Sequence, residues 1–400
     1  MGNVPNLRFP EFSGEWSSQP LTDFMNFKNG LNPDAKRFGR GTKFISVMDI
    51  LNNQYICYDN IRASVELQDG DIETYGVDYG DILFQRSSET LEDVGRANVY
   101  LDSKPAIFGG FVIRGKSKGN YNPLFFRYLL ASPTARKRII VKGAGAQHFN
   151  IGQDGLSKVS LDIPRLSEQE KIGKLLQCVD ARIATQNKII EDLKKLKSAI
   201  SKYLFARKDL LETTICLSNI ATLKNGYAFQ SGKYNALGKW KILTITNVPG
   251  ERYINDEDCN CIINLPNDIQ DHQVLKEGDI LISLTGNVGR VSLCKNGNYL
   301  LNQRVGLLQL AKNVNQEFLY QILSSQRFEN SMIACGQGAA QMNIGKGDVE
   351  NYVLPYSSNG NNILFAAKIL HSYDECIINE LRRLTLLTMQ KQYLLTQMFI

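Results

Sequence analysis

Histidine and paired cysteine are scarce in this 400-residue chain, which has three histidines and eight scattered cysteines. No two cysteines form a Cys-x-x-Cys pair, and the nearest approach is Cys259-Asn-Cys261. A structural zinc site needs four correctly spaced nitrogen or sulfur ligands. The sequence therefore predicts no metal site, and it predicts free thiols in a reducing compartment.

Long apolar runs are also missing. No run of about 18 apolar residues occurs, so no membrane-spanning helix is expected. The N-terminus has no apolar signal core, and Asn6 stands where a myristoylation motif needs Ser or Thr. These absences predict a cytoplasmic protein. With 43% hydrophobic and 22% charged residues, the chain has a globular composition and the length of two domains.

Recognisable catalytic motifs are absent as well. Ala340 stands where a phosphate-binding loop would need its first glycine, and both Gly143-x-Gly145 and Gly336-x-Gly338 lack the third glycine of a dinucleotide loop. No Asn/Asp-Pro-Pro-aromatic tetrapeptide of an adenine methyltransferase occurs. The sequence therefore predicts a non-catalytic chain without a cofactor of its own. A nuclease with an unrecognised site is the enzyme alternative.

The strongest pattern that is present is a duplication. Residues 143–152 (GAGAQHFNIG) match residues 336–345 (GQGAAQMNIG) at six of ten positions without a gap. Further pairs follow in the same order: Lys28-Asn-Gly30 with Lys224-Asn-Gly226, Phe44-Ile-Ser-Val47 with Ile242-Leu-Thr-Ile245, Gly80-Asp-Ile-Leu83 with Gly278-Asp-Ile-Leu281, and Val94-Gly-Arg96 with Val288-Gly-Arg290. An ordered series of matches indicates a tandem repeat of one module.

Both copies predict the same order of elements. Short β-branched and aromatic runs separated by Gly, Asn and Asp indicate strands joined by turns. A helical segment follows (near 122–140 and 315–332), then the Gly-rich loop, a short strand and a long helix. We therefore expect a mixed α/β protein. Its expected parts are a globular domain at 1–163, a central helix at 164–208, a second globular domain at 209–358 and a C-terminal helix at 359–400.

The two long helices carry heptad repeats. In each helix, eight of the ten a and d positions are apolar. The two polar residues of each repeat occupy equivalent heptad positions: Gln186 and Lys197 in one helix, and Glu380 and Lys391 in the other. Such a sustained stripe is typical of a coiled-coil seam. The expected seam residues are Ile172, Leu176, Val179, Ile183, Gln186, Ile190, Leu193, Ile200 and Leu204, with Leu370, Tyr373, Ile377, Glu380, Leu384, Leu387, Leu394 and Met398.

The start and the pairing of these helices can also be predicted. Ser167 and Glu170 have the spacing of a capping box, whereas copy two has Ser357-Ser-Asn-Gly-Asn-Asn362 at that place. Antiparallel pairing would relate the copies by a pseudo-twofold axis and bring Gln186 and Glu380 together as a buried hydrogen-bonded pair. The alternative is two amphipathic helices that each lie on their own domain.

Positive charge is concentrated in a few segments. The net charge is +6, and residues 165–208 alone carry eleven Lys/Arg against five Asp/Glu. Such runs attract phosphates but also occur on solvated helix faces, so charge alone leaves both interpretations open. A duplicated, basic chain without catalytic motifs favours a binder of something with approximate twofold symmetry, such as duplex DNA.

In their duplicated order, these motifs resemble the specificity (S) subunits of type I restriction–modification systems. The resemblance covers essentially the whole chain. It rests on the opening Val4-Pro-Asn-Leu-Arg-Phe-Pro-Glu-Phe12, the two Gly-Asp-Ile-Leu motifs, the two Asn-Ile-Gly loops and Pro164-x-x-Ser-Glu-Gln-Glu170. It implies two target recognition domains that each read one part of a split DNA sequence, with paired helices that set the unread gap.

The resemblance also implies partners and cofactors outside this chain. Members of this family work with two modification subunits, which bind S-adenosylmethionine and methylate adenine at N6. Restriction subunits add ATP- and magnesium-dependent translocation and cleavage. No membrane partner is implied. The rival interpretation is a coiled-coil scaffold whose globular ends bind protein without DNA specificity.

Residues that read DNA are expected on the loops. Arg, Lys, Asn and Gln present paired donors or acceptors to base edges, and other cations hold phosphates. Residues shared by both copies suit phosphate or structural roles, and base readers should lie where the copies differ, such as Arg86 against Leu284. The Gly-rich loops are expected to be tight turns rather than phosphate cradles. The candidates are Lys28, Asn29, Arg86, Arg96, Lys142, Gln147 and His148 in copy one, and Lys224, Asn225, Thr285, Asn287, Arg290, Gln303, Arg304 and Gln341 in copy two.

Overall fold

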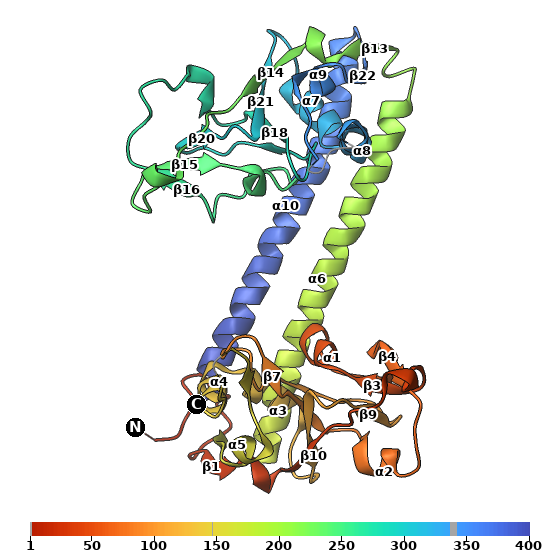
Figure 1. The fold of residues 1–400 in the computed structure, drawn as a ribbon, viewed down its shortest axis with the longest axis vertical. Helices are drawn as coiled ribbons and strands as arrows, with labels where there is room; N and C mark the ends of the chain where they lie inside the picture. The colour runs from red at the N-terminus through yellow and green to blue at the C-terminus, as the bar shows by residue number, and fades with distance from the viewer. Residues whose placement is uncertain (1, 146, 337–341) are drawn as a thin grey trace. The chain divides into compact units, whose positions relative to one another are not determined.

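The computed structural model describes residues 2–145, 147–336 and 342–400 (Figure 1). The chain divides into two compact units, and each is described by itself. The first runs up to Asn187 and also contains Arg383–Ile400, and the second is Lys188–Arg382. Each unit therefore holds one globular domain, a part of the central helix and a part of the C-terminal helix.

The elements of the first unit have the following bounds. The strands are β1 (Ser17–Pro20), β2 (Met25–Asn29), β3 (Phe38–Ile45), β4 (Ala63–Val65), β5 (Gly76–Val77), β6 (Ile82–Gln85), β7 (Ser87–Ser88), β8 (Ala97–Val99), β9 (Ala106–Phe108), β10 (Val112–Ser117), β11 (Phe149–Asn150) and β12 (Ser160–Ile163). The helices are α1 (Val47–Asn52), α2 (Asp71–Tyr75), α3 (Pro123–Ala131), α4 (Pro133–Ile140) and α5 (Gln153–Ser157), with short 3-10 helices at Leu21–Asp23, Ala35–Arg37 and Tyr58–Asn60. The long helix α6 (Leu166–Ala206) continues into the second unit.

The second unit has a matching set of elements. Its strands are β13 (Thr213–Cys216), β14 (Ala221–Asn225), β15 (Trp240–Leu243), β16 (Asn260–Ile262), β17 (Val274–Leu275), β18 (Ile280–Ser283), β19 (Val291–Leu293), β20 (Tyr299–Leu301), β21 (Val305–Leu310) and β22 (Val353–Tyr356). Its helices are α7 (Gln316–Leu323), α8 (Gln326–Cys335) and α9 (Lys346–Glu350), with 3-10 helices at Leu217–Asn219, Ser231–Lys233, Ile245–Asn247 and Asp271–Gln273. The long helix α10 (Gly360–Gln397) ends in the first unit.

Two four-stranded sheets form the frame of each unit. In the first unit the orders are β2-β10-β6-β8 and β4-β3-β9-β5, and the pair β3/β9 is parallel. In the second unit the orders are β14-β21-β18-β19 and β16-β15-β20-β17, and the pair β15/β20 is parallel. The pairs β1/β12 and β13/β22 correspond as well. The second unit therefore repeats both four-stranded sheets and this strand pair, which confirms the predicted duplication, whereas the short pair β7/β11 belongs to the first unit.

Each predicted helical segment after the sheets is two helices rather than one. In the first unit, α3 ends and α4 begins at Ser132, whose hydroxyl accepts the N–H of Ala135 at 3.3 Å. Pro133 follows and has no N–H to continue the first helix. In the second unit, α7 and α8 are separated at Ser324 and Ser325. The helical segments expected near 122–140 and 315–332 are therefore confirmed, and each consists of two helices.

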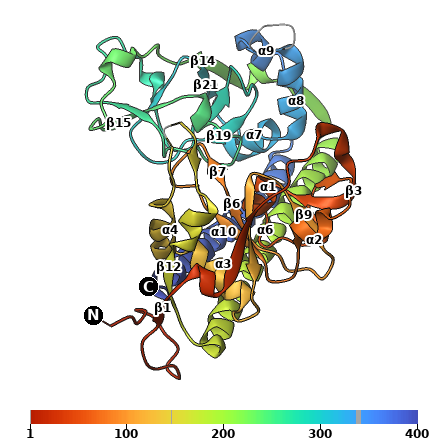
Figure 2. The same ribbon diagram turned by 60° about the horizontal axis from the view of Figure 1, so that its bottom comes forward.

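Apolar packing joins the sheet of each unit to the long helices. In the first unit, Phe84 of β6 belongs to the same buried cluster as Leu176 of α6. Both elements are labelled in Figure 2. In the second unit, Ile282 of β18 shares a buried cluster with Leu204 of α6 and Leu370 of α10. Burial of such a side chain contributes roughly 1.5–3 kcal/mol. The globular domains and the helix pair therefore share continuous cores.

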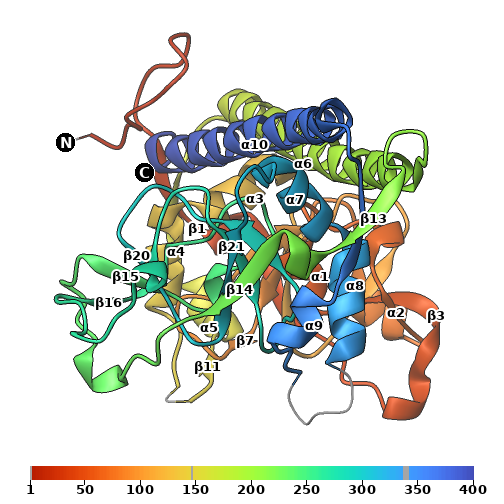
Figure 3. The same cartoon turned by 90° about the horizontal axis from the view of Figure 1, so that it is seen from above.

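The helices α6 and α10 run antiparallel (Figures 1 and 3). In the first unit, Lys391 Nζ lies 2.6 Å from Asp180 Oδ1. In the second unit, Lys197 Nζ lies 2.6 Å from Asp374 Oδ1. As the residue number rises along α6 it therefore falls along α10, in agreement with the prediction.

The heptad positions of both helices are enclosed to different degrees. Buried positions are Ile172, Leu176, Val179, Gln186, Ile190, Leu204, Leu370, Ile377, Leu394 and Met398. Half-buried positions are Ile183, Leu193, Ile200, Tyr373, Glu380, Leu384 and Leu387. Side chains off the stripe, such as Leu386 and Tyr393, are exposed. The hydrogen-bonded pairing of Gln186 with Glu380 stays a prediction.

The start of α6 differs from the expectation. The helix begins at Leu166, and the carbonyl of Arg165 accepts the N–H of Glu168 at 3.0 Å. Ser167 lies inside the first turn, so the predicted capping box is wrong. Glu168 instead accepts two hydrogen bonds from Arg8, each 2.8 Å long. This part of the motif ties the N-terminal segment to the helix.

A buried carboxylate, Asp180, links the first domain to both helices. Besides Lys391, it accepts hydrogen bonds from Tyr128 Oη at 2.8 Å and from Arg127 Nη1 at 3.1 Å, both on α3. Burial acts to raise the pKa of Asp180, but the hydrogen bonds and positive charges of these partners outweigh it, so its pKa lies below the ordinary 3.8. The carboxylate stays ionised and fully paired.

Asp374 has the same role in the second domain. Its Oδ2 accepts hydrogen bonds from Gln321 of α7 at 2.6 Å and from Arg252 at 3.0 Å, and its Oδ1 faces Lys197. Arg252 also forms a bidentate pair with Glu317 of α7. Each unit therefore has one buried aspartate that receives a lysine from the opposite helix and polar groups from its own domain.

Asp180→Asn should lower the free energy of unfolding at neutral pH by roughly 1–3 kcal/mol, because it removes the charge that Lys391 and Arg127 face. Since the folded pKa of Asp180 lies below 3.8, its contribution is present above that pH and is lost as the pH falls through the lowered pKa. Thermal unfolding of wild type and variant should therefore converge in acid. The exposed Asp192→Asn on the same helix is the control, and a difference that does not change with pH would contradict the assignment.

Candidate nucleic-acid interface

Loops from distant parts of the sequence meet at one end of the β2-β10-β6-β8 sheet in the first unit. The segment after β2 reaches the loop after β9, where Leu31 N–H donates to Phe108 O at 2.9 Å. The loop after β6 joins the loop before β10, where Arg86 N–H donates to Phe111 O at 2.9 Å. The Gly-rich loop joins them through Ile151 N–H and Arg86 O, also at 2.9 Å. We call this edge the loop junction.

The second unit has the same loop junction. Tyr227 N–H donates to Leu301 O at 2.8 Å, and Leu284 N–H donates to Arg304 O at 3.0 Å. Ile344 N–H donates to Leu284 O at 2.9 Å. In globular proteins, loops carry binding residues more often than the elements they connect. Their side chains lie at the surface and are not required for core packing. The two loop junctions are the candidate interface.

The repeated Lys-Asn-Gly motif holds the backbone of this junction together. A Cβ on Gly30 would lie 2.1 Å from the carbonyl oxygen of Gly109, and a Cβ on Gly226 would lie 2.1 Å from that of Asn302. Only glycine allows this approach. The preceding Lys28 lies over the Tyr75 ring at 5.4 Å from its centre. The repeated motif therefore has a packing role in both domains.

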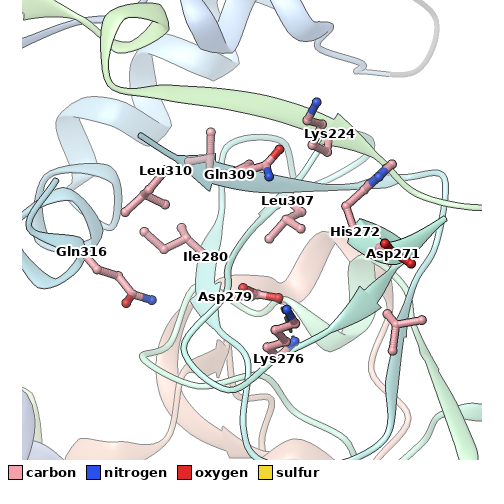
Figure 4. A pocket seen from close by; sticks show the side chains of 12 residues that line it. Lys224, Asp271, His272, Lys276, Asp279, Ile280, Leu307, Gln309, Leu310 and Gln316 are labelled. Carbon is pink, nitrogen blue, oxygen red and sulfur yellow. Dashed lines mark hydrogen bonds between the residues drawn. The ribbon is translucent and has the colours of Figure 1, made fainter. Parts of the chain in front are cut away.

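Lys224, the counterpart of Lys28, lines a pocket of about 480 Å³ beside β14, β18 and β21 (Figure 4). His272 and Asp279 lie around the same pocket. Burial raises the pKa of Asp279, although the backbone N–H of Lys276 stabilises the carboxylate. Lys224 therefore contributes to the wall of this pocket.

The repeated Val-Gly-Arg motif is likewise occupied by internal contacts. Gly289 has φ +78°, and a Cβ there would lie 2.6 Å from Met332 Cβ on α8. The arginines that follow these glycines are ion-paired: Arg96 with Asp93 at 2.6 Å, and Arg290 with Glu329 at 3.4 Å. The shared cations are therefore engaged within their own domains.

The remaining candidates of the two units are the shared asparagines Asn29 and Asn225 and the residues that differ between the copies. Asn29 is exposed at the end of β2, where Gln153 Oε1 accepts its side-chain N–H at 3.1 Å. Thr285 is half-buried, and its Oγ1 is buried without a hydrogen-bond partner among the described residues. Arg86 is half-buried. Asn225, Asn287, Gln303 and Arg304 are exposed.

The Gly-rich loop of the first unit closes on itself. Ala144 and Asn150 form an antiparallel bridge with backbone hydrogen bonds of 2.9 and 2.8 Å. Lys142, Gln147 and His148 are exposed on this loop. The remaining candidate, Gln341, lies outside the described residues.

Two general features bear on the class of the protein. Within residues 2–145, 147–336 and 342–400, no three His, Cys, Asp or Glu side chains gather into a group that could hold a metal ion. In the same ranges, no helix is long and apolar enough to cross a membrane.

Comparison with known proteins identifies the family. A family model described as type I restriction modification DNA specificity domain matches the chain twice, over residues 13–195 and 212–388. Two relatives come from Methanocaldococcus jannaschii. The putative type I restriction enzyme MjaX specificity subunit is 23% identical over 373 residues, which cover 88% of this chain and 85% of the relative. The type I restriction enzyme MjaVIII specificity subunit is 24% identical over 351 residues, which cover 82% and 78%.

Solved structures share the fold over nearly the whole length. The S subunit of a type I restriction–modification system from M. genitalium has a TM-score of 0.59 at 16% identity and covers 99% of both chains. A chain from a structure on complex assembly and conformational transition of the type I R-M system has a TM-score of 0.55 at 12% identity, covering 95% of this chain and 96% of that one. The chain belongs to the family of type I restriction–modification DNA specificity subunits. Its two specificity domains make it a DNA target-recognition protein, and the scaffold alternative is not supported.

Gly226→Ala should destabilise the second domain by roughly 1–3 kcal/mol, because the new methyl group collides with the Asn302 carbonyl. Gly232→Ala is the matched control, since a Cβ there meets no atom within 4 Å. Thermal unfolding of the two variants measures the difference. Equal melting temperatures would show that the Lys-Asn-Gly motif is not needed for packing.

Proposed function

We propose that this chain reads a bipartite DNA target, with one half-site for each loop junction and with an unread gap set by α6 and α10. The target recognition domains are assigned to 1–163 and 209–358, and the spacer helices to 164–208 and 359–400. The observation that carries the proposal is that two copies of one sheet edge share their packing residues but differ in the polar side chains of their loops. Such a design suits two readers of different sequences.

Phosphate contacts and base contacts have different requirements. Phosphate contacts need cations but carry no sequence information, and base contacts need side chains with fixed donor and acceptor geometry. Exposed Lys142, Gln147 and His148 in the first domain and Asn287, Gln303 and Arg304 in the second meet one or the other requirement. Backbone hydrogen bonds at the loop junctions restrain these loops, and such preorganisation lowers the entropy lost on binding.

The chemistry of the complex is assigned to other subunits. We propose two modification subunits that bind S-adenosylmethionine and methylate adenine at N6, and restriction subunits that use ATP and magnesium. Family membership supports this division, because the chain matches specificity domains along most of its length. Since its substrate would be cellular DNA, we place the chain in the cytoplasm.

The complex of this chain with its modification subunits should select two short sequences separated by a fixed unread gap from a random duplex library. The gap is expected because the two domains are carried on one helix pair. A chain that acts only as a protein scaffold would select no split motif. Incubation of the purified chain with magnesium and plasmid tests the enzyme alternative, and reproducible cleavage would support a nuclease instead.

Lengthening both helices by one heptad, after Ile190 in α6 and after Glu380 in α10, should widen the gap and leave both half-sequences unchanged. Seven helical residues add about 10.5 Å, which corresponds to about three base pairs. Library selection with the lengthened complex measures the new gap. The control is a seven-residue insertion after Leu237, whose side chain is 90% exposed. An unchanged gap in the lengthened chain would show that the helices do not set it.

A further inference from the structure

Arg86 occupies a defined position at the loop junction of the first domain. The ladder between β6 and β10 pairs Gln85 with Val112, and the backbone bond from Arg86 to Phe111 extends this ladder by one step. Side chains alternate between the two faces of a strand. Arg86 and Phe111 therefore stand opposite each other on the face that carries Phe84. Phe111 is 68% exposed at this position.

The second domain has the equivalent cross-strand pair, but its arginine lies on the other strand of the pair. The ladder between β18 and β21 pairs Ser283 with Val305, and the bond from Leu284 to Arg304 extends it by one step. Because β18 corresponds to β6 and β21 to β10, Leu284 takes the place of Arg86 and Arg304 takes the place of Phe111. The arginine has moved from one strand of the step to the other.

The exchanged arginines also differ from the shared ones in their partners. Arg96 and Arg290 are held by carboxylates, as described above. Arg86 donates only a 3.3 Å hydrogen bond, to the carbonyl of Gly110, and faces no carboxylate within the described ranges. The guanidinium of Arg304 makes no hydrogen bond or ion pair there and is exposed. The donors of both exchanged guanidinium groups therefore remain available to a ligand.

Arginine has a specific partner among the bases. Its planar guanidinium donates two hydrogen bonds to O6 and N7 of guanine in the major groove, which is the commonest base-specific contact. The two sides of an antiparallel step lie about 5 Å apart. That distance exceeds the rise of about 3.4 Å per nucleotide of one DNA strand. An arginine on one strand of this cross-strand pair would therefore reach a different base position from an arginine on the other strand.

We propose that Arg86 and Arg304 are specificity-determining residues, each reading a guanine in the half-site of its own domain at positions that differ between the domains. This inference rests on the proposed function and names the side chains that make the two half-sites differ. Arg96, Arg290, Lys28 and Lys224 belong to the common frame.

Arg86→Lys and Arg304→Lys test the proposal, because lysine keeps the positive charge but loses the planar pair of donors. Complexes of wild type and variants with modification subunits are used to select duplexes from a random library. Each variant should lose roughly tenfold or more of the preference for guanine at one position of one half-site, and the other half-site should stay unchanged. The salt dependence of binding should stay the same, since the charge is kept.

Arg327→Lys on α8 is the matched control, because Arg327 is also exposed and should leave both half-sites unchanged. The inference is overturned if both lysine variants select the wild-type motif, or if they lose affinity evenly for all sequences. A wild-type complex that selects no split motif would instead overturn the proposed function. The guanidinium of Arg304 has no intramolecular partner in the described ranges, so Arg304→Lys should fold and still tests the proposal if Arg86→Lys does not fold.

Discussion

The buried carboxylates of Asp180 and Asp374 are the constraint on which the rest of the structure depends. Each is enclosed between a domain and the helix pair, where an unpaired charge would be strongly destabilising. Each therefore has to receive its lysine, from the opposite helix, and its hydrogen bonds from α3 or α7 at the same time. The register of the helices and the attachment of each domain are consequently set by the same contacts.

In each domain, the residues that maintain the packing are distinct from the loop residues that differ between the two domains. The glycines of Lys-Asn-Gly allow the close backbone approach at each loop junction, and the arginines of Val-Gly-Arg are ion-paired. These residues recur in both domains because the packing problem is the same in both. Arg86, Phe111, Leu284 and Arg304 stand on the equivalent step and do not recur. A rigid common frame with exchangeable side chains lets one fold address two DNA sequences.

Several features were predictable because they depend on local or periodic patterns. The heptads predicted two long helices, and the repeated motifs predicted two equivalent domains. The break between α3 and α4 had a signal in Ser132-Pro133, but Ser324 and Ser325 carry no comparable one. The predicted capping box of Ser167 and Glu170 is wrong because α6 already begins at Leu166, so Ser167 lies inside the helix. Lys197 and Lys391 looked like breaks in the seam, although Asp180 and Asp374 recur at the same offset of 194 and could have identified their partners.

The sequence by itself determined the duplication, the heptad stripes and the family, since each is a linear pattern that survives without knowledge of contacts. Only the tertiary structure decided which shared residues serve packing, and which loop residues face each other across the extended β6/β10 and β18/β21 ladders. Those relations join residues that are far apart in the chain. They depend on strand register and helix direction, and a one-residue change in register would place every side chain on the opposite face.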